Sequence, residues 1–363
     1  MTMVAAPPLS TFPAERTEVG PTSRADRLTI IVPAYNEAAS IRDTVESLLG
    51  QTTRPAEVIV IDDCSTDDTA AIAREAGATV IQPPQNTGSK AGAQNFALTQ
   101  VTTEYVMAID ADTVLAPDAV ELIMAAFDEP GVAVACGFVL PRHVETIWER
   151  GRYVEYLFAF TYFKRIQDWH DKALIASGCF SVYRSDVLMP LGGWPTRTMA
   201  EDMDLTWTLH EQGRGVRFVP EALSYPIEPR DYNFMSKQLR RWSHGFVQNV
   251  RQHWRGIVEV SYLRSAVAVG LWDASVASIL FLVAMPLLAL FVSPWFLLGY
   301  LIDLPVVAVP VLAAAIPRGE TMKALASLPS FAVLRLVNSL FFLRALWSEL
   351  VLGRSLTVYE KGH

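Results

Sequence analysis

Short apolar runs alternate with helix-type segments through the first 140 residues of the chain. The apolar runs lie at residues 28–33, 58–61, 78–81, 105–109 and 132–135. Segments typical of helices lie between them, at about 36–49, 69–75, 88–100 and 117–127. Strands that alternate with helices predict a parallel sheet with right-handed crossovers. The first part of the chain is therefore expected to be an α/β domain with a mainly parallel, Rossmann-like sheet.

The pattern is less regular after residue 140. Residues 143–175 are rich in aromatic side chains and predict a helix, residues 178–184 predict a strand, and a helix is expected to start at 201–202. Residues 231–262 predict one or two amphipathic helices in which Trp and Phe alternate with Lys and Arg. This mixture of aromatic and basic residues suits the interface of a membrane.

The last hundred residues are strongly apolar. No charged residue lies between Ala274 and Ile302, and a membrane-spanning helix needs about 20 apolar residues. We place one span at about 266–291 and a second at about 295–316, with a turn at 293–295. A third stretch, 324–351, contains Arg335 and Arg344, and either crosses the membrane or lies in its interface. Asp273 and Asp303 fall in the two spans, where an acid either faces protein or water or lies near an interface.

Charge and composition narrow the class of protein. The chain has 363 residues, is 51% hydrophobic and carries a formal net charge of −8, so a nucleic-acid partner is not expected. The three cysteines lack the spacing of a zinc site and indicate reduced thiols in a cytosolic domain. Positive charges at 317–323 place that loop and the α/β part on the cytosolic side of a multi-pass protein of the cell (inner or plasma) membrane.

Acidic residues follow the predicted strands. Asp62-Asp63 and Asp110-x-Asp112 each end an apolar run, and Glu201-Asp202 follows later. In open α/β sheets, ligands bind beyond the carboxyl ends of the strands, and carboxylates there can hold a divalent cation that in turn holds phosphate. The chain lacks the GxGxxG motif of dinucleotide-binding proteins. The pattern therefore indicates a nucleotide-sugar site beside a membrane.

With the segment Gln238-Leu-Arg-Arg241-Trp242 added, the chain resembles the family 2 glycosyltransferases, which have the GT-A fold. The resemblance is closest to the membrane-bound processive branch of cellulose, chitin, hyaluronan and poly-N-acetylglucosamine synthases. It covers residues 28–250 well and the C-terminal helices more loosely. It implies inverting transfer from a UDP-sugar to a growing polysaccharide, with Mg²⁺ or Mn²⁺ as cofactor and N-acetylglucosamine or glucose as the favoured sugar.

The resemblance assigns a role to each matching residue of the sheet part. Asp63 binds the uracil or its ribose, and Lys90 lies near the phosphates. Asp110 and Asp112 form the DxD motif at the metal, with Asp112 favoured as the direct ligand. The first loop around the nucleotide contains Pro33, Ala34, Tyr35 and Glu37.

The later motifs carry the acceptor side of the reaction in the same resemblance. Asp202 is the catalytic base, and Glu201 and Gln238 contact the acceptor or product. Arg241 holds the pyrophosphate, and Trp242 stacks on the acceptor sugar. Three positions depart from the family pattern: Cys64 replaces a Gly, Ala200 replaces a Thr, and Gln94 replaces an apolar residue. None of these removes a proposed catalytic group.

The implied organisation has five segments. They are a disordered tail at 1–26, a cytosolic glycosyltransferase domain at 27–230, amphipathic interfacial helices at 231–264, transmembrane helices at 265–351, and a C-terminal tail at 352–363. The expected partners are the UDP-sugar, a glycan or lipid-linked acceptor, membrane lipid, and a homo-oligomer or export partner.

Three other functions fit parts of this pattern. The main alternative is a non-processive enzyme that adds one sugar to a lipid or lipid-linked acceptor. A catalytically inactive nucleotide-sugar sensor would need no intact acidic set. A nucleotidyltransferase would share the sheet and the metal-binding acids but would not need Gln238-x-x-Arg241-Trp242.

Overall fold

The computed structural model describes residues 24–164, 167 and 172–357. Contacts group them into two compact units, each described by itself. The sheet unit takes the described residues of Met1–His143, Ala176–Thr196 and Arg214–Ile227. The helical unit takes those of Val144–Ile175, Arg197–Gly213 and Glu228–His363. The five predicted segments are consecutive along the chain, whereas each of these two units combines several separate segments, so the five-segment division stays a prediction. Most of the predicted tail at 1–26 lies outside the described residues.

Eight strands within the described residues form one sheet, in the order β3-β2-β1-β4-β7-β6-β8-β5. The strands β1 to β4 pair in parallel, as do β6 and β8, whereas β7 runs antiparallel to both of its neighbours and β5 runs antiparallel to β8. The strands are β1 (Leu28–Ala34), β2 (Glu57–Asp62), β3 (Thr79–Ile81), β4 (Tyr105–Ile109), β5 (Thr113–Leu115), β6 (Val132–Val139), β7 (Phe180–Arg184) and β8 (Gly215–Pro226). The α/β prediction is confirmed, and the sheet is mixed beyond β4.

The strand β8 is absent from the sequence-based expectation. Its residues alternate between buried and partly exposed, as in a half-covered strand, but Pro220 and Glu221 interrupt the pattern. The pairing with β6 shifts register between Gly137 and Phe138, opposite this interruption. An irregularity of this kind lets a strand accommodate a proline, which cannot donate a ladder hydrogen bond.

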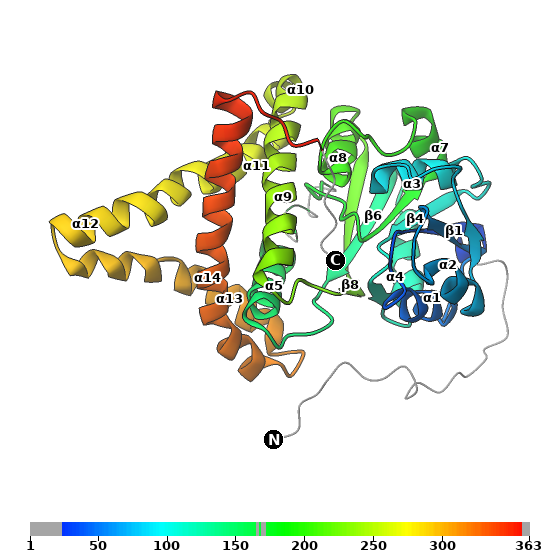
Figure 1. The fold of residues 1–363 in the computed structure, drawn as a ribbon, viewed down its shortest axis with the longest axis horizontal. Coiled ribbons are helices and arrows are strands. Elements are labelled where there is room, and N and C mark those ends of the chain that lie inside the picture. Colours follow the sequence, from blue (N-terminus) through cyan, green and yellow to red (C-terminus); the bar gives the residue numbers. More distant parts are fainter. Residues whose placement is uncertain (1–23, 165–166, 168–171, 358–363) are drawn as a thin grey trace. The chain divides into compact units, whose positions relative to one another are not determined.

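Helices of the sheet unit connect the strands (Figure 1). The helix α3 is capped at its N-terminus by Ser89, whose side chain accepts a hydrogen bond from the Gly92 amide at 3.1 Å. It packs against β1 and β2, while α4 packs against β6 and β8. The helices are η2 (Arg24–Arg27), α1 (Ile41–Leu49), α2 (Thr69–Glu75), α3 (Lys90–Leu98), α4 (Ala119–Ala125), η3 (Ala126–Asp128), α7 (Ser185–Leu188) and η5 (Met189–Leu191).

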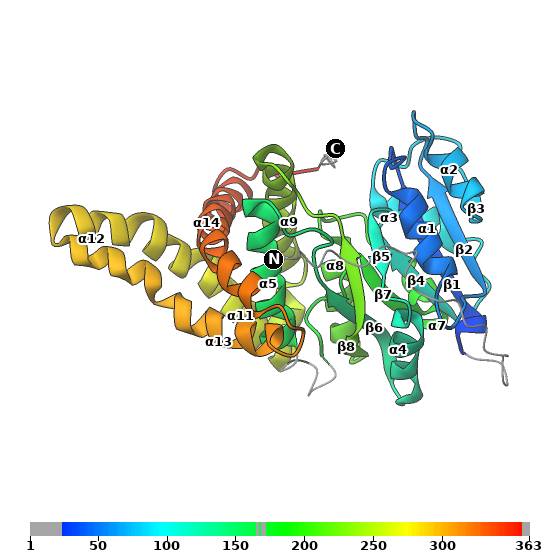
Figure 2. The ribbon, with the colours of Figure 1, turned by 90° about the horizontal axis from the view of Figure 1, so that it is seen from below.

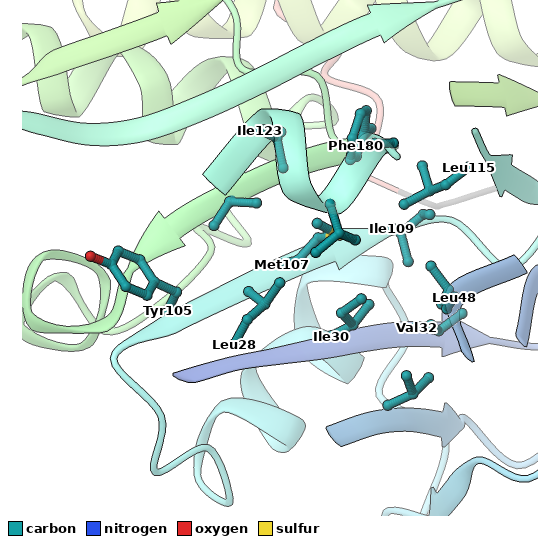
Figure 3. Close-up of a cluster of buried hydrophobic side chains, with 14 of the residues drawn as sticks. Leu28, Ile30, Val32, Leu48, Tyr105, Met107, Ile109, Leu115, Ile123 and Phe180 are labelled. Atoms are coloured by element: carbon teal, nitrogen blue, oxygen red, sulfur yellow. The ribbon is translucent and has the colours of Figure 1, made fainter. Parts of the chain in front are cut away.

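Alternate residues of β1 and β4 form the core of the sheet unit. Leu28 of β1 pairs in register with Tyr105 of β4, and Ile30 pairs with Met107. Figure 3 shows these side chains on one face of the two strands, together with Ile123 of α4. All are buried, and burying a large aliphatic side chain contributes about 1.5–3 kcal/mol. This core fixes the positions of the strand ends.

The helical unit is built around α5, α9 and α14. The helix α5 starts with a capping box made by Thr146 and Glu149. The helix α9 is capped by Asp231, whose carboxylate accepts a hydrogen bond from the Phe234 amide at 2.9 Å. Figures 1 and 2 show α14 running beside α9 and α5. The helices before the apolar segment are α5 (Ile147–Phe158), η4 (Ala159–Phe163), α8 (Glu201–Glu211), α9 (Tyr232–Gln252) and α10 (Trp254–Glu259).

Three helices among the described residues are long and apolar enough to cross a membrane. They extend over Ser261–Phe291, Pro294–Ala315 and Thr321–Val351. Their elements are α11 (Ser261–Trp272), η6 (Asp273–Ala277), η7 (Leu280–Ala284), α12 (Met285–Phe291), η8 (Pro294–Leu301), α13 (Asp303–Ala315), α14 (Thr321–Leu346) and η9 (Trp347–Val351). The third stretch, left open above, has the length of a span.

Asp273 in the first apolar helix has a protein partner. The Asp273 carboxylate accepts a hydrogen bond from Arg335 Nη2 at 2.7 Å and forms an ion pair with it. Ionisable groups at membrane depth pair with one another because an isolated charge there is costly. The pair joins the first apolar helix to the third, and it accounts for two charges that interrupt otherwise apolar sequence.

Candidate active site

The carboxyl ends of three parallel strands lie at one edge of the sheet. The strand β1 lies between β2 and β4, with Ala34 in register with Asp62. The amide of Asp63 donates to the carbonyl oxygen of Ala34 at 2.8 Å. The strand β4 ends at Ile109, directly before Asp110. The sheet thus brings the ends of these three strands, and the predicted nucleotide residues that follow them, to one edge.

Asp63 is held in a fixed orientation. It is only 6% exposed. Its Oδ1 accepts from the Thr87 amide at 2.8 Å and its Oδ2 accepts from Thr87 Oγ1 at 2.9 Å. Asn86 Nδ2 donates to the Asp63 carbonyl oxygen at 2.7 Å. Asn86 and Thr87 were not among the predicted site residues, because nothing local in the sequence links the loop before α3 to the end of β2.

The first loop is joined to the loop after β2. Tyr35 is 39% exposed. The amide of Glu37 donates to Thr69 Oγ1 at 2.7 Å, and its carboxylate accepts from Ser40 Oγ at 2.9 Å. Pro33 is half-buried and Ala34 is buried. The loop therefore presents Tyr35 outward, while Glu37 stabilises the start of α1.

Cys64 adopts a left-handed backbone conformation, with φ of 62°. Glycine has no Cβ and reaches this region without strain, whereas other residues are uncommon there. The resemblance places a glycine at this position, and the observed conformation gives a physical reason for that preference. Cys64 keeps the turn at a conformational cost.

Asp110, Asp112 and Lys90 supply the charges beside β4. Lys90 Nζ forms an ion pair with Asp110 Oδ1 and donates to the Gly178 carbonyl oxygen at 2.9 Å. Asp112 Oδ1 accepts from Thr113 Oγ1 at 3.2 Å, and its carbonyl oxygen accepts from the Ile227 amide at 3.2 Å. Asp110 and Asp112 flank Ala111 in the short segment that connects β4 to β5.

This pair of carboxylates fits a divalent cation of the Mg²⁺ or Mn²⁺ type. Hard oxygen ligands suit both ions. Among the described residues, no group of three or more His, Cys, Asp or Glu side chains is arranged to hold a metal. Magnesium is usually bound through one or two carboxylates together with substrate phosphates. Asp110 and Asp112 match that mode in ligand type and number.

The acidic start of α8 contains two kinds of carboxylate. Glu201 and Asp202 are half-buried in the first turn, and Asp202 Oδ1 accepts from the Met203 amide at 2.8 Å. Asp204 is fully buried. It accepts from Arg197 Nη2 at 2.7 Å and lies 2.9 Å from His253 Nε2. Asp204 is therefore a structural anchor, whereas Glu201 and Asp202 at the helix start keep partial exposure.

His253 is expected to make stability depend on pH. Burial disfavours its charged ring, but hydrogen bonds with Asp204 and Glu211 raise its pKa above the ordinary value. A raised folded-state pKa gives stability that is complete below the unfolded pKa of about 6.5 and is lost as pH rises through the folded pKa. Between pH 6 and 8.5, we expect the thermal midpoint of the wild type in detergent to fall by about 2–4 °C relative to that of a variant without a titrating group at position 253.

The variant His253→Gln tests this prediction because Gln hydrogen-bonds without titrating. In this variant, the thermal midpoint should no longer show the decrease with pH that His253 causes. His143→Gln, at an exposed position, should show the same decrease as the wild type. Burial lowers the pKa of His210 to about 4. His210 therefore makes the protein more stable as pH rises, and it does so equally in the wild type and in both variants. Equal pH profiles for the wild type and His253→Gln would contradict the prediction.

The predicted acceptor motif lies on α9. Gln238 and Arg241 are half-buried, and Trp242 is 37% exposed. Gln238 and Trp242 are four residues apart, so they share one face of the helix. Both contact Arg152 of α5: its Nη2 donates to Gln238 Oε1 at 2.7 Å, and its guanidinium carbon lies 4.3 Å from the Trp242 ring centroid. Arg152 was not predicted; its one sequence signal is a charge within the aromatic stretch.

Comparisons with known sequences identify proteins similar to this chain. Residues 29–192 match the family described as Glycosyl transferase family 2. A poly-beta-1,6-N-acetyl-D-glucosamine synthase of Staphylococcus aureus (strain COL) is 28% identical over 222 residues, which are 60% of this chain and 54% of the relative. The synthase of the same name from Staphylococcus epidermidis is 30% identical over 223 residues, with shares of 60% and 54%. The chain spans about half the length of the curated relatives it matches.

A solved structure shares the fold. The mannosyltransferase PcManGT from Pyrobaculum calidifontis, in complex with GDP-Man and Mn²⁺, superposes with a TM-score of 0.59 at 21% identity. The match covers 90% of this chain and 87% of that one. At this level of identity the likeness concerns the fold alone, and it confirms the GT-A-type architecture.

Proposed function

We propose that the protein, whose residues 29–192 match the family 2 glycosyltransferases, is a membrane-anchored enzyme that transfers sugar from a UDP-sugar to a growing polysaccharide. The observation that carries the proposal is the acidic edge of the sheet, where Asp63, Asp110 and Asp112 follow parallel strands. Three helices long and apolar enough to cross a membrane support the anchor. The name of the staphylococcal relatives supports N-acetylglucosamine as the sugar and a polymer as the product.

In the proposed mechanism, the sheet unit binds the donor. Asp63 holds the uridine, since Thr87 fixes both of its carboxylate oxygens in place. Asp110 and Asp112 would hold Mg²⁺ or Mn²⁺, which when bound supplies Lewis-acid stabilisation of the UDP leaving group. Lys90, beside Asp110, adds positive charge for the phosphates.

The helical unit supplies the acceptor side. Asp202 takes the proton of the acceptor hydroxyl as general base. That oxygen then displaces UDP from the anomeric carbon in one step, which inverts the configuration. Trp242 stacks on the acceptor sugar, Glu201 and Gln238 contact it, and Arg241 neutralises the pyrophosphate. These assignments come from the family resemblance.

A donor screen tests the proposal. The purified protein in nanodiscs, with Mn²⁺ or Mg²⁺, is offered UDP-N-acetylglucosamine, UDP-glucose and GDP-mannose, and nucleotide release and product size are measured. We expect UDP release with one UDP-sugar and a ladder of polymeric products. Addition of a single sugar to lipid would establish the non-processive alternative. No nucleotide release with any donor would contradict the proposal and favour the sensor.

Trp242→Ala is expected to impair acceptor use more than donor binding. Removing a central aromatic contact costs about 2 kcal/mol, so the acceptor KM should rise about 30-fold while the UDP affinity stays within about twofold. Calorimetry with UDP and kinetics with a β-1,6-linked N-acetylglucosamine pentasaccharide separate the two effects. Trp254→Ala, at an exposed tryptophan of α10, is the matched control. Equal losses in both readouts would contradict the stacking role.

A further inference from the structure

A buried arginine contacts two side chains of the acceptor motif at once. The Arg152 side chain is 1% exposed, yet its guanidinium reaches both Gln238 and Trp242 on α9. Gln238 accepts a hydrogen bond from Nη2 at 2.7 Å, and the Trp242 ring centroid lies 4.3 Å from the guanidinium carbon. Arg152 therefore contacts the functional groups of the motif itself and not only the backbone that carries them.

Acidic partners hold this arginine in place. Glu155 forms an ion pair with its Nη1, and Glu228 Oε2 lies 3.7 Å from its Nε. Glu228 is buried and accepts a hydrogen bond from Tyr156 Oη at 2.7 Å. Although burial disfavours the charged guanidinium, these neighbouring acids keep its pKa above the ordinary value. The group therefore carries its charge in a buried, polar cluster.

Burying the charged groups of Arg152 and Glu228 costs more free energy than a purely structural contact would require. Taking charges out of water costs several kcal/mol for each ion, and buried ion pairs are often no more stabilising than apolar residues of similar volume. An apolar side chain at position 152 would also fill the space between α5 and α9. Unlike an apolar side chain, a planar guanidinium donates several hydrogen bonds in fixed directions and stacks on an aromatic ring.

We propose that Arg152 is a positioning residue for the acceptor: it fixes the orientation of Gln238 and of the Trp242 ring. With its guanidinium against one face of the indole, Arg152 leaves the remaining exposed part of Trp242 to receive a sugar ring. The hydrogen bond to Gln238 orients that amide on the same face of α9. This inference rests on the proposed function, because it assumes that Trp242 and Gln238 serve an acceptor.

The test compares variants of Arg152 in the full-length protein in nanodiscs. Arg152→Met keeps the length of the side chain but removes the charge and the donors. We expect the KM for the β-1,6-linked N-acetylglucosamine pentasaccharide to rise about tenfold, from the lost stacking and hydrogen bond. The KM for the UDP-sugar should stay within about twofold, and the products formed without added acceptor should become shorter. Equal changes in both KM values would overturn the proposal and leave a structural role.

Two further variants guard against loss of folding. Arg152→Lys keeps a buried positive charge beside Glu155 and Glu228, so the variant should fold. Because it lacks the planar guanidinium with its several donors, it should still raise the acceptor KM. Arg230→Met removes ion pairs with Glu145 and Glu149 in the same unit without touching α9 side chains of the motif, and both KM values should be unchanged. An Arg152→Lys protein with wild-type acceptor KM and wild-type product length would overturn the proposal.

A double-mutant cycle isolates the contact. In a Trp242→Ala background, Arg152→Lys should raise the acceptor KM no more than about threefold, because part of what it positions is already gone. Full additivity of the two substitutions would overturn the coupling. Failure of this proposal can be distinguished from failure of the proposed function. If the wild type releases no UDP with any donor, the proposed function is wrong. If the wild type is active but the effects of the two substitutions are additive, only the role of Arg152 is refuted.

Discussion

Asp202→Asn is expected to abolish sugar transfer while UDP binding stays intact. Asn has the size of Asp but cannot accept a proton from the acceptor hydroxyl. Loss of a general base lowers kcat by about 10²- to 10⁴-fold. Asp202 is half-buried at the start of α8, whereas Asp204 of the same helix is fully buried. UDP release with the active donor measures kcat, and calorimetry with UDP and Mn²⁺ measures binding.

Asp204→Asn is the matched control, two residues further along the same helix. Asp204 is fully buried and pairs with Arg197 and His253. Its replacement should therefore lower the thermal midpoint, by several degrees, since breaking a buried pair costs about 3–5 kcal/mol. Asp202→Asn should lower the midpoint much less, because Asp202 is half-buried and the Asn side-chain oxygen can still accept the Met203 amide hydrogen bond. Full activity of Asp202→Asn would remove Asp202 as the base.

Asp112→Asn is expected to remove metal-dependent transfer. The amide has one oxygen in place of two and no charge, so it binds Mg²⁺ or Mn²⁺ more weakly. Lewis-acid stabilisation is worth several kcal/mol, which predicts a fall in kcat of about a thousandfold. The Mn²⁺ concentration needed for half-maximal UDP binding should rise as well. Titration of Mn²⁺ in the presence of UDP checks this without relying on turnover.

Asp118→Asn provides the control for this substitution. Asp118 is exposed before α4 and makes no side-chain capping hydrogen bond, so its amide variant should bind Mn²⁺ and turn over like the wild type. Chelation of the metal by EDTA should inactivate the wild-type protein and be reversed by added Mn²⁺. If Asp112→Asn retained wild-type Mn²⁺ dependence, Asp112 would not be a metal ligand.

Position along the helix does not separate the roles of the neighbouring acids, and only the family resemblance singled out Asp202 as the base. Glu201, Asp202 and Asp204 have similar spacing from the helix start, and all three suit the positive end of the helix dipole. The structure shows that Asp204 is buried against Arg197 and His253, which lie outside α8. Partners that come from other segments decide which carboxylate is structural.

Local chemistry allowed much of the sheet unit to be predicted. The apolar runs at 58–61 and 105–109 became β2 and β4, because continuous apolar β-type runs suit strands buried on both faces. Parallel strands end at one edge, so the acids that follow them were expected at that edge before the structure was known. The same local reasoning missed β8, whose pairing with β6 depends on a register shift across Pro220.

The sequence by itself determined an α/β sheet with acids after its strands, a helix that carries Gln238 and Trp242 on one face, and apolar helices of membrane-spanning length. These properties depend on short-range periodicity and on composition, which each segment carries alone. Only the tertiary structure decided which distant side chains meet. Arg152 and Gln238 are 86 residues apart, and Asp273 and Arg335 are 62 apart. Such pairs form because packing brings their helices together and because a buried charge requires a partner, and neither condition is written in any one segment.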